Sequence, residues 1–397
     1  MKMQSVSETL NSIYDDSKNT LGKDNRSSLD YAPLVPSINF STAHAYADEI
    51  SLEKYHNNKL DHHRYSRDSN PLVNQLEIIF SELYGGQAIL FSSGMSAIWS
   101  VLWSHACDID RIYTLGSFYR KTLVNIDGIC NATKCTHENF ESIEAMKSAD
   151  QGGNLLIYLE SPSNPFLTIV DISKIRSMFP NAVIVYDSTM AGLYNDRKDL
   201  SDVDYTVSSV TKYIGGHNDV IGGVVTTKDE RKFEKLWDIR SSQGGILDPM
   251  SAYLLFRSLK TYDIRMECAL RNTEIAFEFL CNSSTVVELY YPGRGQNINQ
   301  EGTFHDCYYH GGSVITFLLK SEISLSPRLK SLHSSKMAPS FGSTDTLIER
   351  PATMSHAGKS ALELSLLGLQ PNHVRLSVGM EPEGYILKDL ERLCLAN

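Results

Sequence analysis

The spacing of apolar residues changes along the chain. Residues 1–60 are mostly polar and contain no long periodic segment, so we expect an N-terminal arm with one short helix at its start. Further on, Leu155–Leu159, Ala182–Tyr186 and Tyr205–Val207 are short apolar runs, and Asp171–Phe179 has the pattern of a crossover helix. Runs that are apolar on both faces and separated by helices are typical of a parallel sheet.

The flanking segments extend this α/β pattern. Ala88–Phe91 predicts another strand, and a helix with one apolar face begins just after it, at Ser93-Gly94-Met95. Ile221–Thr226 predicts a further strand, and the segment 248–280 predicts a long helical stretch that leads into a second α/β unit. We therefore expect three parts: an arm at 1–60, a large domain at 61–258 and a small C-terminal domain at 259–397.

Composition and charge exclude several classes of protein. Of the 397 residues, 42% are hydrophobic and 21% are charged, which is unlike a disordered chain, a collagen-like repeat or a small disulfide scaffold. The formal net charge is −10, so we expect no nucleic-acid partner and no membrane-surface partner. No apolar run is long enough for a membrane span. Polar residues at 1–17 and seven scattered cysteines favour a cytoplasmic location.

Polar clusters follow each of the three apolar runs directly. The first run ends in Glu160-Ser161-Pro162-Ser163-Asn164-Pro165, the second in Asp187-Ser188-Thr189, and the third in Ser208-Ser209-Val210-Thr211-Lys212. Ligands of open parallel sheets bind beyond the carboxyl ends of the strands. We therefore expect Asn164, Asp187 and Lys212 to converge on one crevice.

A lysine beside a carboxylate and hydroxyls has two interpretations. The first is a structural ion pair, which is what an arbitrary Lys or Asp usually makes. The second is a site for pyridoxal phosphate (PLP), in which the lysine binds the aldehyde and the carboxylate keeps the pyridine nitrogen protonated. The phosphate then needs N–H groups at a helix N-terminus and hydroxyls. Ser93-Gly94-Met95, with Ser209 and Thr211, offers such a cradle.

Six blocks of residues together resemble one family. With them the chain resembles the cystathionine γ-synthase/γ-lyase group of Cys/Met-metabolism enzymes, which are fold-type I PLP proteins. The resemblance implies a mostly parallel, seven-stranded-type sheet with helices on both faces, plus a smaller C-terminal α/β domain. The blocks are Tyr65-Ser66-Arg67-Asp68-Ser69-Asn70-Pro71, Ser92-Ser93-Gly94-Met95, Glu160 to Pro165, Ser209 to Asp219, Pro351-Ala352-Thr353-Met354-Ser355-His356 and Arg375-Leu376-Ser377-Val378-Gly379.

The resemblance also implies roles for single residues. It makes Lys212 the lysine that binds the cofactor and shuttles the proton, Asp187 the partner of the pyridine nitrogen, and Asn164 a contact of the cofactor ring and of the substrate. Arg375 is implied to clamp the substrate α-carboxylate. The phosphate is implied to be held by Ser93, Gly94, Met95, Ser209 and Thr211.

Tyr65 and Arg67 are implied to act between subunits. In the family these residues reach the cofactor phosphate of the neighbouring subunit, and Tyr65 is counted among the catalytic residues. The resemblance therefore implies a homodimer or homotetramer with shared active sites.

Two stretches depart from the family pattern. The family has a tyrosine that covers the cofactor ring, and the ungapped match places Leu115 there, although a local shift would bring in Tyr113, Phe118 or Tyr119. Asp345 then Thr346 stand where Glu then Ser are common, and we expect these two residues to contact the substrate.

The predicted function is that of a divergent family member, in a specialised pathway. The leading hypothesis is a PLP-dependent lyase or transferase that acts on an amino acid with a leaving group at Cγ, by elimination or replacement. The alternative is β-elimination from cysteine-like substrates. A catalytically silent relative is the third hypothesis, and the joint presence of Lys212, Asp187 and Arg375 argues against it.

Overall fold

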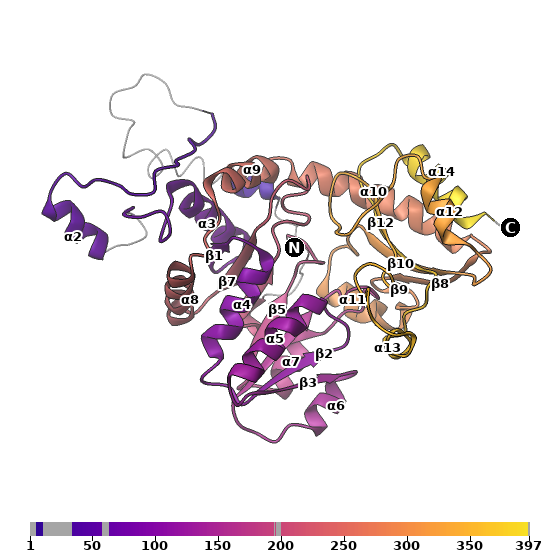
Figure 1. Cartoon of the computed structure of the whole chain (residues 1–397), viewed down its shortest axis with the longest axis horizontal. Helices are drawn as coiled ribbons and strands as arrows, with labels where there is room; N and C mark the ends of the chain where they lie inside the picture. The colour runs from indigo at the N-terminus through magenta and orange to yellow at the C-terminus, as the bar shows by residue number, and fades with distance from the viewer. Residues whose placement is uncertain (1–4, 11–33, 58–62, 194, 196–199, 396–397) are drawn as a thin grey trace.

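Two β-sheets organise the part of the chain that the structure describes (Figure 1). The structure is a computed structural model, and it describes residues 5–10, 34–57, 63–193, 195 and 200–395. The first sheet has seven strands in the order β1-β7-β6-β5-β4-β2-β3, and the second has six in the order β11-β12-β13-β10-β8-β9. The two sheets span residues 87–227 and 286–377, respectively.

The seven-stranded sheet is mostly parallel, which confirms the predicted fold class. Within it, β7 alone runs antiparallel to its neighbours β1 and β6. Strand β4 reads LLIYLE and is buried throughout, because helices cover both faces of the sheet. The strands are β1 (Gln87–Phe91), β2 (Arg111–Leu115), β3 (Thr136–Phe140), β4 (Leu155–Glu160), β5 (Val183–Asp187), β6 (Tyr205–Ser208) and β7 (Gly223–Thr227).

Alternate side chains of these strands belong to different apolar clusters. Tyr158 packs with residues of α4 (Gly94–His105), α5 (Arg120–Ala132) and α8 (Glu230–Gln243). Its neighbours Ile157 and Leu159 pack with α6 (Ile143–Ser148) and α7 (Ile172–Met178) on the opposite face. On that second face, Leu90 of β1 packs with α3 (Pro71–Tyr84) and α9 (Pro249–Leu259).

Local sequence explains where the site-forming helices begin. Ser93 caps α4, and its hydroxyl accepts a hydrogen bond from the Ser96 N–H at 3.0 Å, which satisfies one free N–H group of the first turn. Asp248 caps α9 in the same way. The long helical stretch expected at 248–280 is two helices, because α9 ends at Leu259 and α10 (Tyr262–Cys281) begins after a two-residue break.

The second sheet supplies the C-terminal half of the molecule. Helix α10 runs toward it from the larger sheet and, with α14 (Glu383–Cys394), packs on one of its faces (Figure 1). Its strands are β8 (Val286–Tyr291), β9 (Arg294–Gly295), β10 (Val314–Leu319), β11 (Lys336–Met337), β12 (Leu347–Glu349) and β13 (His373–Ser377). The remaining helices here are α11 (Glu301–Cys307), α12 (Leu325–Lys330) and α13 (Ala361–Leu366).

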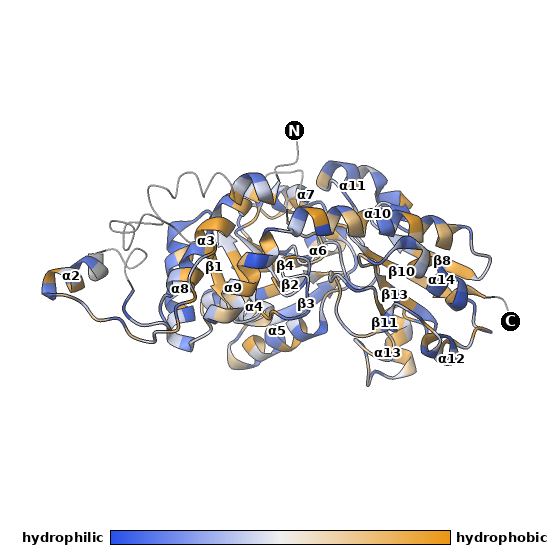
Figure 2. Cartoon of the chain, turned by 90° about the horizontal axis from the view of Figure 1, so that it is seen from above, coloured by the Kyte–Doolittle hydropathy of each residue, from blue (hydrophilic) through white to orange (hydrophobic). Residues whose placement is uncertain are grey.

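The N-terminal segment differs from a simple arm. Residues 6–10 are helical, and Val6 and Leu10 are buried in the cluster that contains Leu72 and Leu255. The Asp263 carboxylate accepts hydrogen bonds from the N–H groups of this helix at 3.0–3.2 Å. By contrast, α2 (Glu49–Asn57) stands away from the rest of the chain in both views (Figures 1 and 2). Residues 11–33 of the predicted arm lie outside the described residues.

None of the helices in the described ranges is both long enough and apolar enough to cross a bilayer.

Candidate active site

Two acidic residues and a lysine gather where three parallel strands end. Glu160 is the last residue of β4 and pairs in register with Asp187, the last residue of β5, which in turn pairs with Val207 near the end of β6. Lys212 lies in the turn that follows β6. The structure therefore brings Asp187 and Lys212 to the same edge of the sheet, as the parallel topology requires.

Lys212 is a largely buried amine with one hydrogen bond. Its Nζ donates to Ser340 Oγ at 2.8 Å and lies 5.1 Å from the ring centroid of Phe341. Burial, and then the positive charge of Arg375, lower the pKa of Lys212 to about 8, and the Glu349 carboxylate opposes that shift. A substantial share of the amine is therefore neutral near pH 8, which a nucleophilic or proton-accepting lysine needs.

Arg265 fixes the turn that carries Lys212. Its guanidinium donates to the carbonyl oxygens of Tyr213 at 2.9 Å, Ile214 at 3.0 Å and Ser258 at 3.1 Å. Gly216 passes directly beneath this guanidinium with φ +67°, and a Cβ there would lie 2.6 Å from Arg265 Cζ. The close approach requires glycine at this position.

Asp187 is a buried carboxylate held by neutral donors. Its Oδ2 accepts from the Tyr158 hydroxyl at 2.7 Å, and its Oδ1 accepts from the Thr189 N–H at 3.0 Å and from the Thr189 hydroxyl at 2.5 Å. Burial raises the pKa of Asp187, and these hydrogen bonds oppose the rise. Among the described residues no cationic side chain pairs with it, so a protonated ring nitrogen fits as the missing counter-charge.

The N-terminus of α4 forms a cradle for an anion. The first N–H groups of a helix have no intrahelical acceptors, and here they belong to Gly94 and Met95. Ser209 closes the cradle: a Cβ on Gly94 would lie 2.9 Å from Ser209 Cβ. Thr211 Oγ1 accepts from the Gly222 N–H at 3.1 Å and donates to the Gly222 carbonyl at 3.3 Å, which holds this hydroxyl beside the Lys212 turn. The predicted phosphate residues thus fit a phosphorylated cofactor.

Arg375 comes from the second sheet and is 3% exposed. Its strand neighbours Val374 and Leu376 face the apolar core, so the arginine faces the other side. There Nη1 donates to Asn164 Oδ1 at 3.0 Å, and Nη2 donates to the Ser340 carbonyl at 2.9 Å and pairs with the Glu349 carboxylate. The Nε–H has no hydrogen-bond partner in the described part of the chain, so this guanidinium can still donate a hydrogen bond to an anion.

Ser340 joins the lysine to the arginine. Its hydroxyl accepts from Lys212 and its carbonyl accepts from Arg375, although the two cations come from different sheets. Its backbone has φ +92°, a conformation that costs a side-chain-bearing residue roughly 1–3 kcal/mol. The two hydrogen bonds keep Ser340 in this strained position.

Tyr65 and Arg67 lie outside this cluster. Both are substantially exposed, and the Arg67 guanidinium carbon lies 5.3 Å from the Tyr65 ring centroid. The buried Arg240 anchors their segment, because its Nη2 donates to the Asp68 carbonyl at 3.1 Å and its Nη1 pairs with Glu77. Within one chain these residues have no contact with Lys212, so their predicted role between subunits stays a prediction.

Leu115 is partly buried at the end of β2, and its expected contact with the cofactor ring stays a prediction. Its side chain packs with Phe140 and the cluster beneath α6 and α7, on the face opposite to α4. The alternation of β2 dictates this direction. Tyr119, one of the open alternatives, has its N–H bonded to Glu160 Oε2 at 2.8 Å and therefore stands at the site edge of the sheet.

Asp345 and Thr346 likewise make contacts away from the cluster. The Thr346 side chain is fully buried: its hydroxyl donates to Glu381 at 2.6 Å and accepts from the Gly379 N–H at 2.9 Å. Asp345 pairs with Lys336 at 2.7 Å, near the surface. The described contacts therefore bring neither Asp345 nor Thr346 to Lys212 or Arg375, and their expected contact with the substrate stays a prediction.

Four residues of the cluster escaped sequence reasoning. Thr189 and Tyr158 hold Asp187, while Ser340 and Glu349 hold Arg375. Thr189 directly follows Asp187 in the polar run after β5, and that position could have pointed to it. The other three carry no local signal, because strand pairing or a distant loop brings them in.

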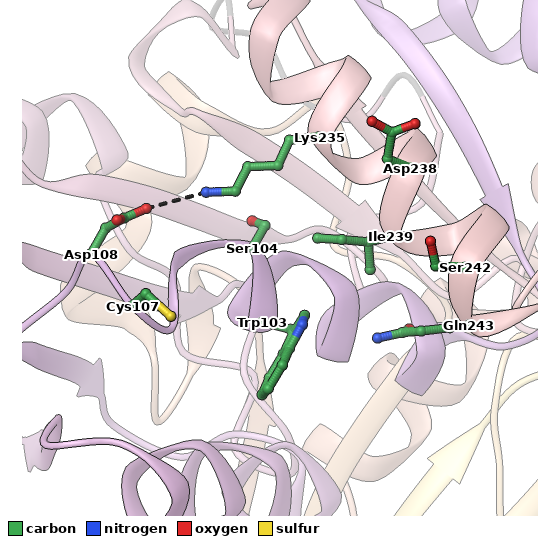
Figure 3. Close-up of a pocket in the computed structure, with 9 residues that line it drawn as sticks. All are labelled: Trp103, Ser104, Cys107, Asp108, Lys235, Asp238, Ile239, Ser242 and Gln243. Carbon is green, nitrogen blue, oxygen red and sulfur yellow. Dashed lines mark hydrogen bonds and ion pairs between the residues drawn. The ribbon is translucent and has the colours of Figure 1, made fainter.

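A separate surface pocket of about 470 Å³ lies between α4 and α8 (Figure 3). Trp103 and the ion pair between Lys235 and Asp108 line it, and none of the predicted site residues does. The described residues also contain no group of three or more His, Cys, Asp or Glu side chains that could hold a metal ion.

Comparison with known proteins agrees with these features. A family model described as Cys/Met metabolism PLP-dependent enzyme matches residues 20–394. An L-methionine gamma-lyase of Fusobacterium nucleatum is 35% identical over 83% of this chain and 85% of its own length. A cystathionine beta-lyase of Lactococcus lactis subsp. cremoris is 32% identical over 83% of this chain and 87% of its own. The crystal structure of a cystathionine gamma-lyase from Lactobacillus plantarum, complexed with L-serine, matches with a TM-score of 0.82 and 30% identity, covering 90% of this chain and 92% of that one.

Proposed function

Because the chain belongs to the family of Cys/Met metabolism PLP-dependent enzymes, we propose that it eliminates or replaces a group at Cγ of an amino acid. The chain is thus a PLP-dependent enzyme of amino-acid metabolism. One observation carries the proposal: Ser340 links the Lys212 amine to the Arg375 guanidinium. An amino acid whose carboxylate binds Arg375 therefore has its α-carbon within reach of Lys212.

The residues divide the work between binding and proton transfer. When bound, PLP withdraws electrons from the α-carbon of an amino acid through its protonated pyridine ring. Asp187 stabilises that ring proton, and Tyr158 and Thr189 orient its carboxylate. Arg375 and Asn164 orient the substrate carboxylate, while the Lys212 Nζ takes the α-proton and delivers protons at neighbouring carbons.

Elimination at Cβ is a second candidate. The Lactococcus lactis relative is a cystathionine beta-lyase and is nearly as similar as the methionine gamma-lyase. The reaction at Cγ additionally requires a second deprotonation, at Cβ, so Lys212 has to reach two carbons in turn. A lysine on a turn, hydrogen-bonded to one serine hydroxyl, has that freedom.

We further propose a homodimer or homotetramer in the cytoplasm, with the small domain starting at residue 259, the last residue of α9. The exposed Tyr65 and Arg67, on a segment anchored by a buried arginine, support an active site shared between subunits. All seven cysteines are free thiols, which supports a reducing compartment.

Absorption spectroscopy and product analysis test the proposal. We expect a band near roughly 420 nm from the lysine-bound cofactor, which Lys212→Ala removes and the surface variant Lys235→Ala keeps. A panel of O-acyl-homoserines, methionine, cystathionine and cysteine then identifies the substrate by release of ammonia and a 2-oxo acid. Turnover of substrates with a leaving group at Cγ supports the leading proposal, and turnover of β-substituted amino acids alone supports the second. A protein that binds the cofactor but converts none of these amino acids contradicts both.

A further inference from the structure

We propose that Glu349 sets the affinity of the site for the α-carboxylate of an amino acid, by occupying Arg375 until the substrate displaces it. The inference rests on the proposed function in one respect, since it takes Arg375 as the group that binds this carboxylate. Glu349 acts through Arg375 and is a positioning residue.

Strand pairing makes this ion pair a fixed feature of the fold. Glu349 is the last residue of β12 and lies directly opposite Arg375 in the antiparallel β12–β13 ladder. Both side chains are almost completely buried, at 2% and 3% exposure. The second carboxylate oxygen of Glu349 accepts from the Ser355 N–H at 3.0 Å. Glu349 is thus anchored on one side and paired with the guanidinium on the other.

The geometry of guanidinium makes Glu349 a competitor of the substrate. A carboxylate binds arginine with two parallel hydrogen bonds either through Nη1 and Nη2 or through Nε and Nη2, so both modes need Nη2. In Arg375, Nη2 already serves the Ser340 carbonyl and the Glu349 carboxylate, whereas Nε–H has no partner. An incoming carboxylate therefore gains its second hydrogen bond only when the Ser340 carbonyl or Glu349 gives up an N–H of Nη2, and the proposal assigns that displacement to Glu349.

Charge adds to this competition. The pair of Arg375 and Glu349 is neutral in the free site, and a substrate carboxylate would place a second negative charge on one buried guanidinium. Substrate binding is consequently weakened by the cost of moving Glu349 away. An amine without a carboxylate does not encounter that cost.

Paired ligands on the holoenzyme separate the carboxylate from the rest of the amino acid. L-Alanine and ethylamine differ by the carboxylate alone, and both can be titrated against the absorbance of the bound cofactor. In Glu349→Gln the amide oxygen can still accept from the Ser355 N–H, but the negatively charged carboxylate beside Arg375 Nη2 is gone. We expect the dissociation constant of L-alanine to fall about tenfold to a hundredfold, which corresponds to one charge-assisted hydrogen bond. That of ethylamine should stay within about twofold.

A control variant, Glu274→Gln, and steady-state kinetics of Glu349→Gln complete the test. Glu274→Gln removes the carboxylate of another pair with arginine, at 2.5 Å from Arg294 on the surface, and should change neither constant. With the identified substrate, Glu349→Gln should lower KM and leave kcat nearly unchanged. Unchanged or weaker L-alanine binding in Glu349→Gln overturns the proposal, and so does equal tightening of ethylamine.

A structure of the wild-type holoenzyme with L-alanine gives a test that needs no variant. We expect the Glu349 carboxylate to have left hydrogen-bonding distance of Arg375 Nη2, and a retained contact overturns the proposal. Failure of the proposed function looks different. In that case the wild-type holoenzyme responds to ethylamine but not to L-alanine, which overturns both proposals together.

Discussion

Replacing Gly216 by alanine should damage the Lys212 turn more than its backbone angle alone explains. The added Cβ would lie 2.6 Å from Arg265 Cζ, so the guanidinium has to leave the carbonyl oxygens of Tyr213 and Ile214. A side chain at this positive φ costs about 1–2 kcal/mol. Losing a hydrogen bond from a charged group costs about 1.5–3 kcal/mol. With both hydrogen bonds lost, we expect a total loss of about 4–8 kcal/mol in the free energy of unfolding, and weaker PLP binding.

Gly85 provides a matched control for this experiment. It has the same φ of +67°, but a Cβ there meets no atom within 4 Å. Gly85→Ala should therefore lose only about 1–2 kcal/mol and keep its affinity for PLP. Denaturant unfolding of the apo proteins and equilibrium titration with PLP measure both quantities. In an Arg265→Ala background, Gly216→Ala should cost no more than Gly85→Ala does. Equal losses for the two glycine variants in the wild-type background would refute the argument.

Three further predictions concern the charges of the site. Burial lowers the pKa of Lys212 from 10.5 to about 8, so the folded chain binds this proton less tightly than the unfolded chain. Lys212→Met should therefore stabilise the apo protein below pH 8, by at most about 3 kcal/mol. Thermal melts should show this gain shrinking between pH 8 and 10.5. Tyr158→Phe removes one of the donors to Asp187 and should weaken PLP binding roughly tenfold by titration, whereas Tyr290→Phe, at a hydroxyl that donates to Glu288, should not. If sites are shared between subunits, refolding a mixture of inactive Lys212→Ala and Arg67→Ala chains should restore part of the activity, and no recovery would contradict the predicted role of Arg67.

Sequence alone indicates the position of a site residue where that residue directly follows a strand. Asp187 ends a buried apolar run and Lys212 follows another, so the parallel topology alone brings them together. Ser340 and Glu349 gave no such signal. Strand β12 has only three residues, and its partner β13 begins 24 positions later, at His373 (373 − 349 = 24), so the pairing of Glu349 with Arg375 is set by tertiary contacts.

The ungapped match does not encode the side-chain directions of Leu115 and Thr346. An alignment without gaps assumes that each strand ends at the same aligned position in every relative. The face of the sheet to which a side chain points is set instead by the alternation along its own strand. Leu115 is the last residue of β2 and points toward α6 and α7 by that alternation. Thr346 precedes β12, where the partly buried carboxylate of Glu381 accepts hydrogen bonds from its hydroxyl and its N–H.

The division of the cluster between two sheets has an evolutionary consequence. Asp187 and Lys212, which we propose to serve the cofactor, lie at the end of β5 and in the turn after β6 of the seven-stranded sheet, whereas Arg375 and Glu349, which we propose to face the substrate carboxylate, belong to the second sheet. Mutations in the second sheet can therefore change substrate specificity while the residues that serve the cofactor stay unchanged. A substitution of Ser340 is the exception, because it disturbs Lys212 and Arg375 at once.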